Sequence, residues 1–298
     1  MENKESNNEV NDMIISIITI NYNNKAGLER TMQSVLSQTV YDKIEYIVVD
    51  GASTDGSAEV LKQHESLLSY AISEPDSGIY NAMNKGIRMA TGDYCLFLNS
   101  GDSLYDTSVV ERCIPLLGQE DFIFGRVQLS PSGKIAWDDV SLPLTMADFF
   151  KSSPIPHQGC FIRKSLFDKE LYDESLHIVS DWKFFLRMII FNDCSYKMTD
   201  NIISFFEENG ISSDSYVCDK ERACVLKELL PNAILLDYYR GLKGEDYCNS
   251  EYNAFFTDLH HYNERFAKMI FRLSLCLTFM MSFLIRGLKF VEKYRNCL

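Results

Sequence analysis

The chain has 298 residues, 46% hydrophobic and 24% charged, which is an ordinary composition for a folded globular protein and argues against wholesale disorder. Its formal net charge of −13 argues against a nucleic-acid partner, because phosphate binding needs clustered Lys and Arg. The nine cysteines include no CxxC pair, so we expect reduced thiols in a cytoplasmic protein. Residues 1–12 are polar and acidic, lack the pattern of a signal peptide, and are expected to be flexible.

The first hundred residues alternate short apolar runs with amphipathic segments. The runs are rich in β-branched residues and end in polar ones, as buried parallel strands do. The predicted strands are 14–21, 44–50, 67–73 and 94–102, the last of which runs into a polar loop. The predicted helices between them are 26–38, 57–64 and 79–90. This alternation predicts an α/β fold with a Rossmann-like, mainly parallel sheet flanked by helices. Further along, 122–130 and 133–138 are predicted strands around a Pro-Ser-Gly turn.

The segment 266–295 differs from the rest of the chain. Its apolar stretch from Leu273 to Ile285 is flanked by Lys and Arg but has only 13 residues, fewer than the ~20 needed to cross a bilayer. We expect an amphipathic helix lying on a membrane surface. Two alternatives stay open: a helix packed on its own domain or on a second copy in a homodimer, and a helix that spans the membrane.

Two aspartates stand directly after predicted buried strands. Asp50 ends VVD before a glycine-rich loop, and Asp102 closes LFLNSGD. Ligands of parallel α/β sheets bind at the carboxyl ends of the strands, so both carboxylates are expected at one edge. Each could instead belong to an ordinary turn, because Asn, Ser, Gly and Asp are common turn residues. Their joint occurrence is what favours a binding site.

Three chained motifs, ISIITINYN, YIVVDGASTDGS and EPDSGIYNAMNKGIRMATGDYCLFLNSGD, resemble the family 2 glycosyltransferases, which have a GT-A fold. The resemblance is strong over 14–105 and looser over 150–215, and the EPDSGIYNAMNKG variant is similar to bacterial enzymes that assemble surface polysaccharides such as lipopolysaccharide and capsule. It implies a catalytic domain at 13–215, with a nucleotide-binding half at 13–105 and an acceptor half at 106–215. A helical region at 216–298 would follow.

The resemblance also implies roles for individual residues of the first half. The nucleotide-binding residues would be Asn21, Tyr22, Asp50, Asp76, Asn84, Lys85 and Ser100, with Asp50 at the base. The Asp-x-Asp position holds Asn-Ser-Gly-Asp, so both of its acids are replaced and Asp102 remains to bind a divalent metal, Mn²⁺ or Mg²⁺.

In the second half, the resemblance makes Asp181 in IVSDWKFFLR the general base, although Ser180 and Asp181 also fit a helix cap. His157 in PIPHQGCFIRK would contact the acceptor or the diphosphate, with a buried packing histidine as the alternative.

The predicted activity is an inverting transfer of a sugar from a nucleotide-diphosphate-sugar, a UDP-sugar being favoured, to a saccharide acceptor. The acceptor is expected to be linked to polyprenyl diphosphate, at the cytoplasmic face of the inner membrane. The replaced Asp-x-Asp keeps a non-catalytic sugar-nucleotide or glycan-binding module open as the alternative. A nicotinamide-dependent oxidoreductase is disfavoured because no GxGxxG follows the first strand.

Overall fold

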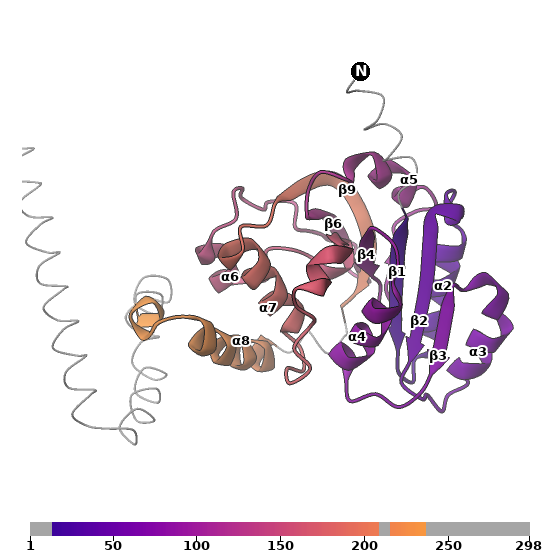
Figure 1. Ribbon diagram of the computed structural model, residues 1–298. Coiled ribbons are helices and arrows are strands. Elements are labelled where there is room, and N and C mark those ends of the chain that lie inside the picture. Colours follow the sequence, from indigo (N-terminus) through magenta and orange to yellow (C-terminus); the bar gives the residue numbers. More distant parts are fainter. Residues whose placement is uncertain (1–13, 209–214, 237–298) are drawn as a thin grey trace, which may run out of the picture. The chain divides into compact units, whose positions relative to one another are not determined.

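The computed structural model describes residues 14–208 and 215–236 (Figure 1). The chain divides into two compact units, Met1–Ala223 and Cys224–Leu298, and the fold and site below belong to the first. The predicted flexible N-terminus and the predicted amphipathic helix at 266–295 lie outside the described residues. Within the described part, no helix has the length and apolar character needed to cross a membrane.

Four parallel strands form the first half of the sheet. β1 (Ile15–Asn21) is buried along its whole length and pairs with β2 (Ile44–Asp50) on one side and β4 (Tyr94–Phe97) on the other. The register places Asn21 opposite Asp50, so the two polar ends come together at the carboxyl edge. β3 (Tyr70–Ser73) extends the sheet beyond β2.

Helices cover both faces of these strands because the strand side chains alternate between faces. Ile15 and Ile17 of β1 pack in one core cluster with residues of α2 (Lys25–Leu36) and α3 (Ser57–Gln63). On the other face, α4 (Ile79–Met89) brings Gly86 against Ile18, where an added Cβ would stand 2.5 Å from Ile18 Cγ2. The close approach of α4 to β1 therefore requires the glycine.

The second half of the sheet is mixed. The sheet has nine strands in the described residues, in the order β3-β2-β1-β4-β8-β6-β9-β5 with β7 beside β6. β8 pairs antiparallel with β4 and β6, whereas β6 and β9 are parallel. The strands are β5 (Ser103–Leu104), β6 (Phe122–Ser130), β7 (Ile135–Ala136), β8 (Cys160–Arg163) and β9 (Tyr196–Glu207). The remaining helices are α5 (Val109–Cys113), α6 (Met146–Lys151), α7 (Ser180–Leu186) and α8 (Ser215–Leu229).

The predicted α/β class with helices on both faces is confirmed. The stretch 94–102, predicted as a strand running into a polar loop, is a strand as far as Phe97 and then the polar loop before β5. Two details differ. The strand expected at 67–73 begins only at Tyr70, since residues 65–67 form a 3-10 turn. The strand expected at 133–138 is reduced to two residues, and Trp137 then takes a left-handed backbone conformation with φ 58° that ends it.

Candidate active site

The carboxyl ends of β1 and β2 are joined by a buried side-chain hydrogen bond. Asn21 Nδ2 donates to Asp50 Oδ1 over 2.7 Å, and Asp50 is fully buried. The carboxylate also accepts hydrogen bonds from Ser53 N and Oγ and from Ser73 Oγ. Burial alone would raise the pKa of Asp50, but these hydrogen bonds hold it below its ordinary value. Asp50 is thus an ionised anchor for the loop that begins at Gly51.

Gly51 lies between Tyr22 and Asp76. A Cβ added at Gly51 would stand 2.5 Å from Asp76 Oδ2 and 3.1 Å from Tyr22 Cδ2, so the three residues enclose one small region above β2. Tyr22 is 69% exposed, which leaves its ring accessible to a ligand. Asp76 Oδ1 accepts a hydrogen bond from Gly78 N, 2.9 Å away, which fixes the turn before α4.

Lys85 of α4 stabilises the same turn. Its Nζ donates to the carbonyl of Pro75 over 2.9 Å and pairs with Glu74 over 2.7 Å. Its side chain is 22% exposed, and these contacts direct the charge toward the segment that carries Asp76.

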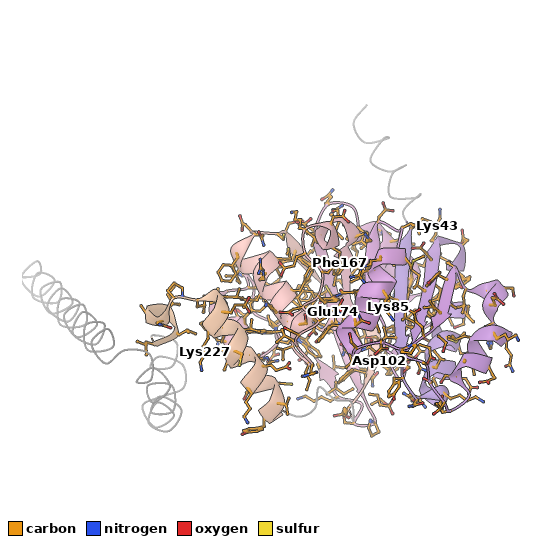
Figure 2. All side chains as sticks on the ribbon, turned by 60° about the horizontal axis from the view of Figure 1, so that its bottom comes forward. Lys43, Lys85, Asp102, Phe167, Glu174 and Lys227 are labelled. Carbon is orange, nitrogen blue, oxygen red and sulfur yellow. The ribbon has the colours of Figure 1, made fainter. Side chains whose placement is uncertain are left out.

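Asn84, predicted to border the nucleotide or sugar, joins two segments of the chain. It is 1% exposed, and its Nδ2 donates to Tyr172 O over 2.9 Å and to Glu174 Oε1 over 2.8 Å. Its Oδ1 accepts from Tyr172 N over 3.0 Å. The amide therefore joins α4 to the segment at 172–174, which Figure 2 marks at Glu174. Local sequence could not reveal these contacts, because the segment at 172–174 that covers α4 is distant in the chain.

Asp102, labelled in Figure 2, is a nearly buried carboxylate beside the end of β9. It is 5% exposed, and its Oδ1 accepts a hydrogen bond from Glu207 N over 3.1 Å. Burial raises the pKa of Asp102 to about 7; the hydrogen bond from Glu207 N lowers it, and the neighbouring Glu207 charge raises it. Glu207 itself pairs with Arg30 over 3.1 Å. A carboxylate of the loop before β5 and one at the end of β9 thus share one region.

The oxygen groups near Asp102 suit a hard divalent cation. Asn99 Oδ1 is buried and has no hydrogen-bond partner in the part of the chain that the structure describes. No group of three or more His, Cys, Asp or Glu that could hold a metal occurs among those residues. Mg²⁺ and Mn²⁺ need no such cage, since one or two carboxylates and the oxygens of a bound phosphate suffice. The buried, raised-pKa carboxylate of Asp102 fits such an ion. Ser100 contributes its carbonyl to this loop, accepting from Asn24 Nδ2 over 3.0 Å.

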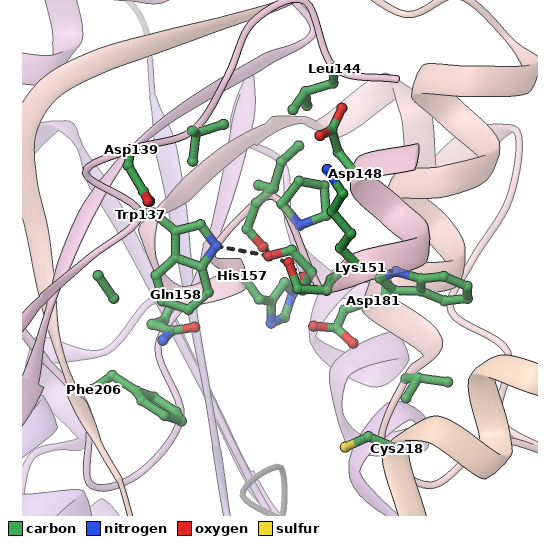
Figure 3. Close-up of a pocket in the computed structure, with 18 of the residues that line it drawn as sticks. Trp137, Asp139, Leu144, Asp148, Lys151, His157, Gln158, Asp181, Phe206 and Cys218 are labelled. Atoms are coloured by element: carbon green, nitrogen blue, oxygen red, sulfur yellow. Dashed lines mark hydrogen bonds between the residues drawn. The ribbon is translucent and has the colours of Figure 1, made fainter. Parts of the chain in front are cut away.

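A cavity of about 1010 Å³ adjoins this region and contains both candidate residues of the second half (Figure 3). His157 and Asp181 present their side chains to it, with Trp137 on one side and Cys218 on the other. Phe206 also lines the cavity, and its neighbour Glu207 binds Asp102. The end of β9 therefore connects the cavity with the Asp102 region.

Asp181 is positioned by α4 as well as by its own helix. It lies in the first turn of α7, and Tyr80 Oη donates toward Asp181 Oδ1 over 2.9 Å and toward Ile178 O over 2.5 Å. Tyr80 is 4% exposed, and burial, together with the Asp181 charge, raises its pKa well above its ordinary value. The phenol thus stays protonated and remains a donor to the carboxylate.

His157 is held among aromatic rings. Its ring stacks on Phe97 with centroids 4.8 Å apart, and its Nε2 lies 2.8 Å from Tyr172 Oη. Burial lowers the pKa of His157, against the opposing effect of the Asp181 charge. A neutral imidazole beside Asp181 can give or accept a hydrogen bond without adding a charge to the cavity.

Three residues of this region were not predicted from sequence. Glu207 follows an apolar run in ISFFEE, and this pattern of a polar residue after a strand could have indicated a site residue. Tyr80 lies inside the EPDSGIYNAMNKG motif. Trp137 had no local signal, because its place on the cavity depends on the turn after β7.

The geometry defines an α/β protein with polar side chains gathered at the carboxyl ends of its parallel strands, beside a cavity lined by a carboxylate and an imidazole. Residues 16–190 match the family model described as Glycosyl transferase family 2. The chain belongs to this family and is a glycosyltransferase, which confirms the resemblance recognised in its motifs.

Individual relatives agree with this assignment. An uncharacterized glycosyltransferase of Mycobacterium tuberculosis is 33% identical over 206 residues, covering 67% of this chain and 77% of the relative. A PGL/p-HBAD biosynthesis glycosyltransferase of Mycobacterium bovis is 29% identical over 215 residues, covering 70% and 82%. The crystal structure of S. aureus TarS in complex with UDP-GlcNAc is similar, with a TM-score of 0.56 and 16% identity over 77% of this chain and 73% of that chain. That last likeness concerns the fold.

The raised pKa of Asp102 predicts a pH-dependent effect of Asp102→Asn in EDTA-containing buffer. The Asp102 carboxyl binds its proton more tightly in the folded state than in the unfolded chain. Protonation of Asp102 therefore contributes fully to the stability of the folded state below about pH 4, and this contribution is lost as pH rises through about 7. Asparagine does not titrate, so the Asp102→Asn variant keeps the same stability at this site as pH rises. Its free energy of unfolding relative to wild type should therefore increase between pH 4 and 8, by up to about 4 kcal/mol at about 1.4 kcal/mol per pKa unit.

Urea denaturation at several pH values measures this difference. Asp200→Asn is the matched control, because the Asp200 side chain is 96% exposed and remains hydrated in the folded protein. A difference between Asp102→Asn and wild type that does not change with pH would contradict the prediction.

Proposed function

We propose that this glycosyltransferase moves a sugar, with inversion, from a nucleotide-diphosphate-sugar to a saccharide or lipid-linked saccharide acceptor. The observation that carries the proposal is the cavity in which the Asp181 carboxylate stands, oriented by Tyr80 and connected through the end of β9 to Asp102. An inverting transfer needs a base for the acceptor hydroxyl on one side of the sugar and a site for the leaving diphosphate on the other.

The donor binds at the carboxyl edge of β1, β2 and β4. Tyr22 and Asp76 enclose the nucleoside region, while Asn21 and Asp50 hold the loop whose Ser53 and Gly51 face it. Lys85 keeps the Asp76 turn in place. The solved TarS structure contains UDP-GlcNAc, which supports a UDP-sugar as the favoured donor here.

A divalent metal, Mn²⁺ or Mg²⁺, would be held by Asp102, with the carboxylate of Glu207 and the amide oxygen of Asn99 nearby. When bound, such an ion supplies Lewis-acid stabilisation of the leaving diphosphate. Ser100 keeps the loop that carries Asp102 in its turn.

Asp181 is the general base. Tyr80 binds its Oδ1, so the other carboxylate oxygen can take the proton of the acceptor hydroxyl. The attacking oxygen then forms its bond to the anomeric carbon as the bond to the diphosphate breaks. His157, neutral and fixed on Phe97, positions the acceptor beside Asp181.

The cellular setting belongs to the same proposal. The EPDSGIYNAMNKG motif is similar to that of bacterial enzymes that build surface polysaccharides, which supports a role in such synthesis. The basic and apolar sequence of 266–295 supports a peripheral location at the cytoplasmic face of the inner membrane.

Asp181→Asn should abolish transfer without affecting donor binding, because the amide cannot accept the proton but keeps the shape of the carboxylate. The expected loss in turnover is about 10²–10⁴-fold, the usual contribution of a general base. Release of nucleotide diphosphate with membrane extract as the acceptor source measures turnover, and calorimetry measures donor binding. Asp168→Asn, a 72% exposed aspartate, is the control. Retained turnover in Asp181→Asn would refute its role as the base.

A thermal-shift panel of uridine, guanosine and thymidine diphosphate sugars tests the donor. A ligand that binds only the folded state stabilises it by about 2.7 kcal/mol at 100 times its dissociation constant. We expect a UDP-sugar to raise the melting temperature most, and Mn²⁺ to increase the shift in wild type but not in Asp102→Asn. A full shift without metal would contradict the metal site, and no shift with any sugar nucleotide would contradict the transferase proposal.

Deletion of residues 266–298 tests the membrane location. We expect the full chain to sediment with inner membranes and the shortened chain to be released, since the basic flanks and the apolar stretch would be gone. Fractionation followed by immunoblotting measures the distribution. An unchanged distribution would leave the segment as a packing helix.

A further inference from the structure

Arg222 on α8 is a cation of the cavity wall that the proposed mechanism does not use. Its Nε atom is buried and has no hydrogen-bond partner among residues 14–208 and 215–236. Its ion pair with Asp219 spans 3.8 Å from Nη1 to Oδ1, which is too long for a hydrogen bond. The guanidinium carbon also lies 5.6 Å from the centroid of the Trp182 ring. Among the described residues, the buried Nε–H donor of Arg222 therefore has no partner, and its guanidinium can bind another group.

The position of Arg222 relative to Asp181 is fixed by the residue before it. Glu221 Oε1 accepts a hydrogen bond from His177 N over 2.7 Å. Glu221 Oε2 accepts from Ile178 N over 2.9 Å and from Val179 N over 3.2 Å. These N–H groups stand directly before α7, whose first turn carries Asp181. The carboxylate thus joins α8 to the start of α7, so the guanidinium and the proposed base belong to one wall of the cavity.

The chemistry of Arg222 selects an oxyanion. A guanidinium presents paired donors that match a carboxylate or a phosphate, and such charge-assisted hydrogen bonds are the strong ones. A partly buried cation with an unsatisfied Nε–H donor costs free energy, and an oxyanion bound to the guanidinium reduces that cost. Asp139, Asp148 and Asp181 also line the cavity and would repel an anion, whereas Lys134 and Lys151 would attract one. Among the described lining residues, Arg222 is the one that offers the paired donors of a guanidinium.

We propose that Arg222 forms an oxyanion subsite for the acceptor, so that the acceptor saccharide carries a carboxylate or a phosphate group. The guanidinium holds this group while a hydroxyl of the same or the adjoining sugar faces Asp181. The inference rests on the proposed function and adds the chemical class of the acceptor.

Calorimetric titration of the full-length protein with three probes tests the subsite. Methyl β-glucuronide carries a carboxylate, glucose 1-phosphate carries a phosphate, and methyl β-glucoside is neutral. We expect wild type to bind at least one anionic probe about tenfold or more tightly than the neutral one, and the tighter anionic probe identifies the group. Arg222→Gln should weaken that binding about tenfold, in line with the loss of a charged hydrogen bond, and leave the neutral probe unchanged.

Lys220→Gln is the matched control, because it removes the same charge from an exposed position on the same helix. It should bind all three probes as wild type does. Arg222→Lys keeps the charge but not the paired donors, and it should fall between wild type and Arg222→Gln. If Arg222→Gln does not fold, the weaker anion binding of Arg222→Lys decides the matter.

Equal affinity of wild type and Arg222→Gln for the anionic probes, or equal affinity of wild type for neutral and anionic probes, would overturn the subsite. UDP-sugar binding is measured on the same preparations. A donor response with no effect of Arg222 refutes the subsite alone, whereas the absence of any donor response refutes the proposed function.

Discussion

A buried hydrogen bond between Asn21 and Asp50 is the constraint on which the donor edge depends. It joins the ends of two parallel strands, and the remaining lone pairs of Asp50 are filled by Ser53 and Ser73. A carboxylate that is buried and saturated in this way keeps its charge and gives the following loop one conformation. In the proposed function, the donor contacts the loop and the exposed Tyr22 ring, and the buried Asp50 supports it by holding the loop in place.

The helix α4 links the donor edge with the reacting end of the cavity. Lys85 holds the turn that carries Asp76, Asn84 holds the segment at 172–174, and Tyr80 holds Asp181. Three side chains of one helix thus set the relative positions of groups that lie about a hundred residues apart in the chain. Rigid support of this kind is what a displacement reaction needs, because the base and the leaving group must stand on opposite sides of one carbon.

The Asp102 region shows how a reduced motif retains an oxygen-rich site. Both acids of the Asp-x-Asp are replaced and only the following Asp102 remains, but Glu207 lies at the end of β9 and its N–H donates to Asp102. The same end of β9 places Phe206 on the cavity. One strand terminus therefore adjoins both the proposed donor region and the proposed acceptor region, and α8 contributes Cys218 and Arg222 to the cavity.

The sequence by itself determined the parallel strands, the helices between them and the polar residues at the strand ends, because these follow from short-range periodicity and from motifs. Asn21 and Asp50 could be assigned to one nucleotide site through those motifs, and the hydrogen bond between them came from the structure. Only the tertiary structure decided that Asn84 binds the segment at 172–174, that Glu207 reaches Asp102, and that Arg222 shares a cavity with Asp181. These contacts join residues tens to a hundred positions apart, and they depend on the mixed pairing of β6, β8 and β9, which no local pattern specifies.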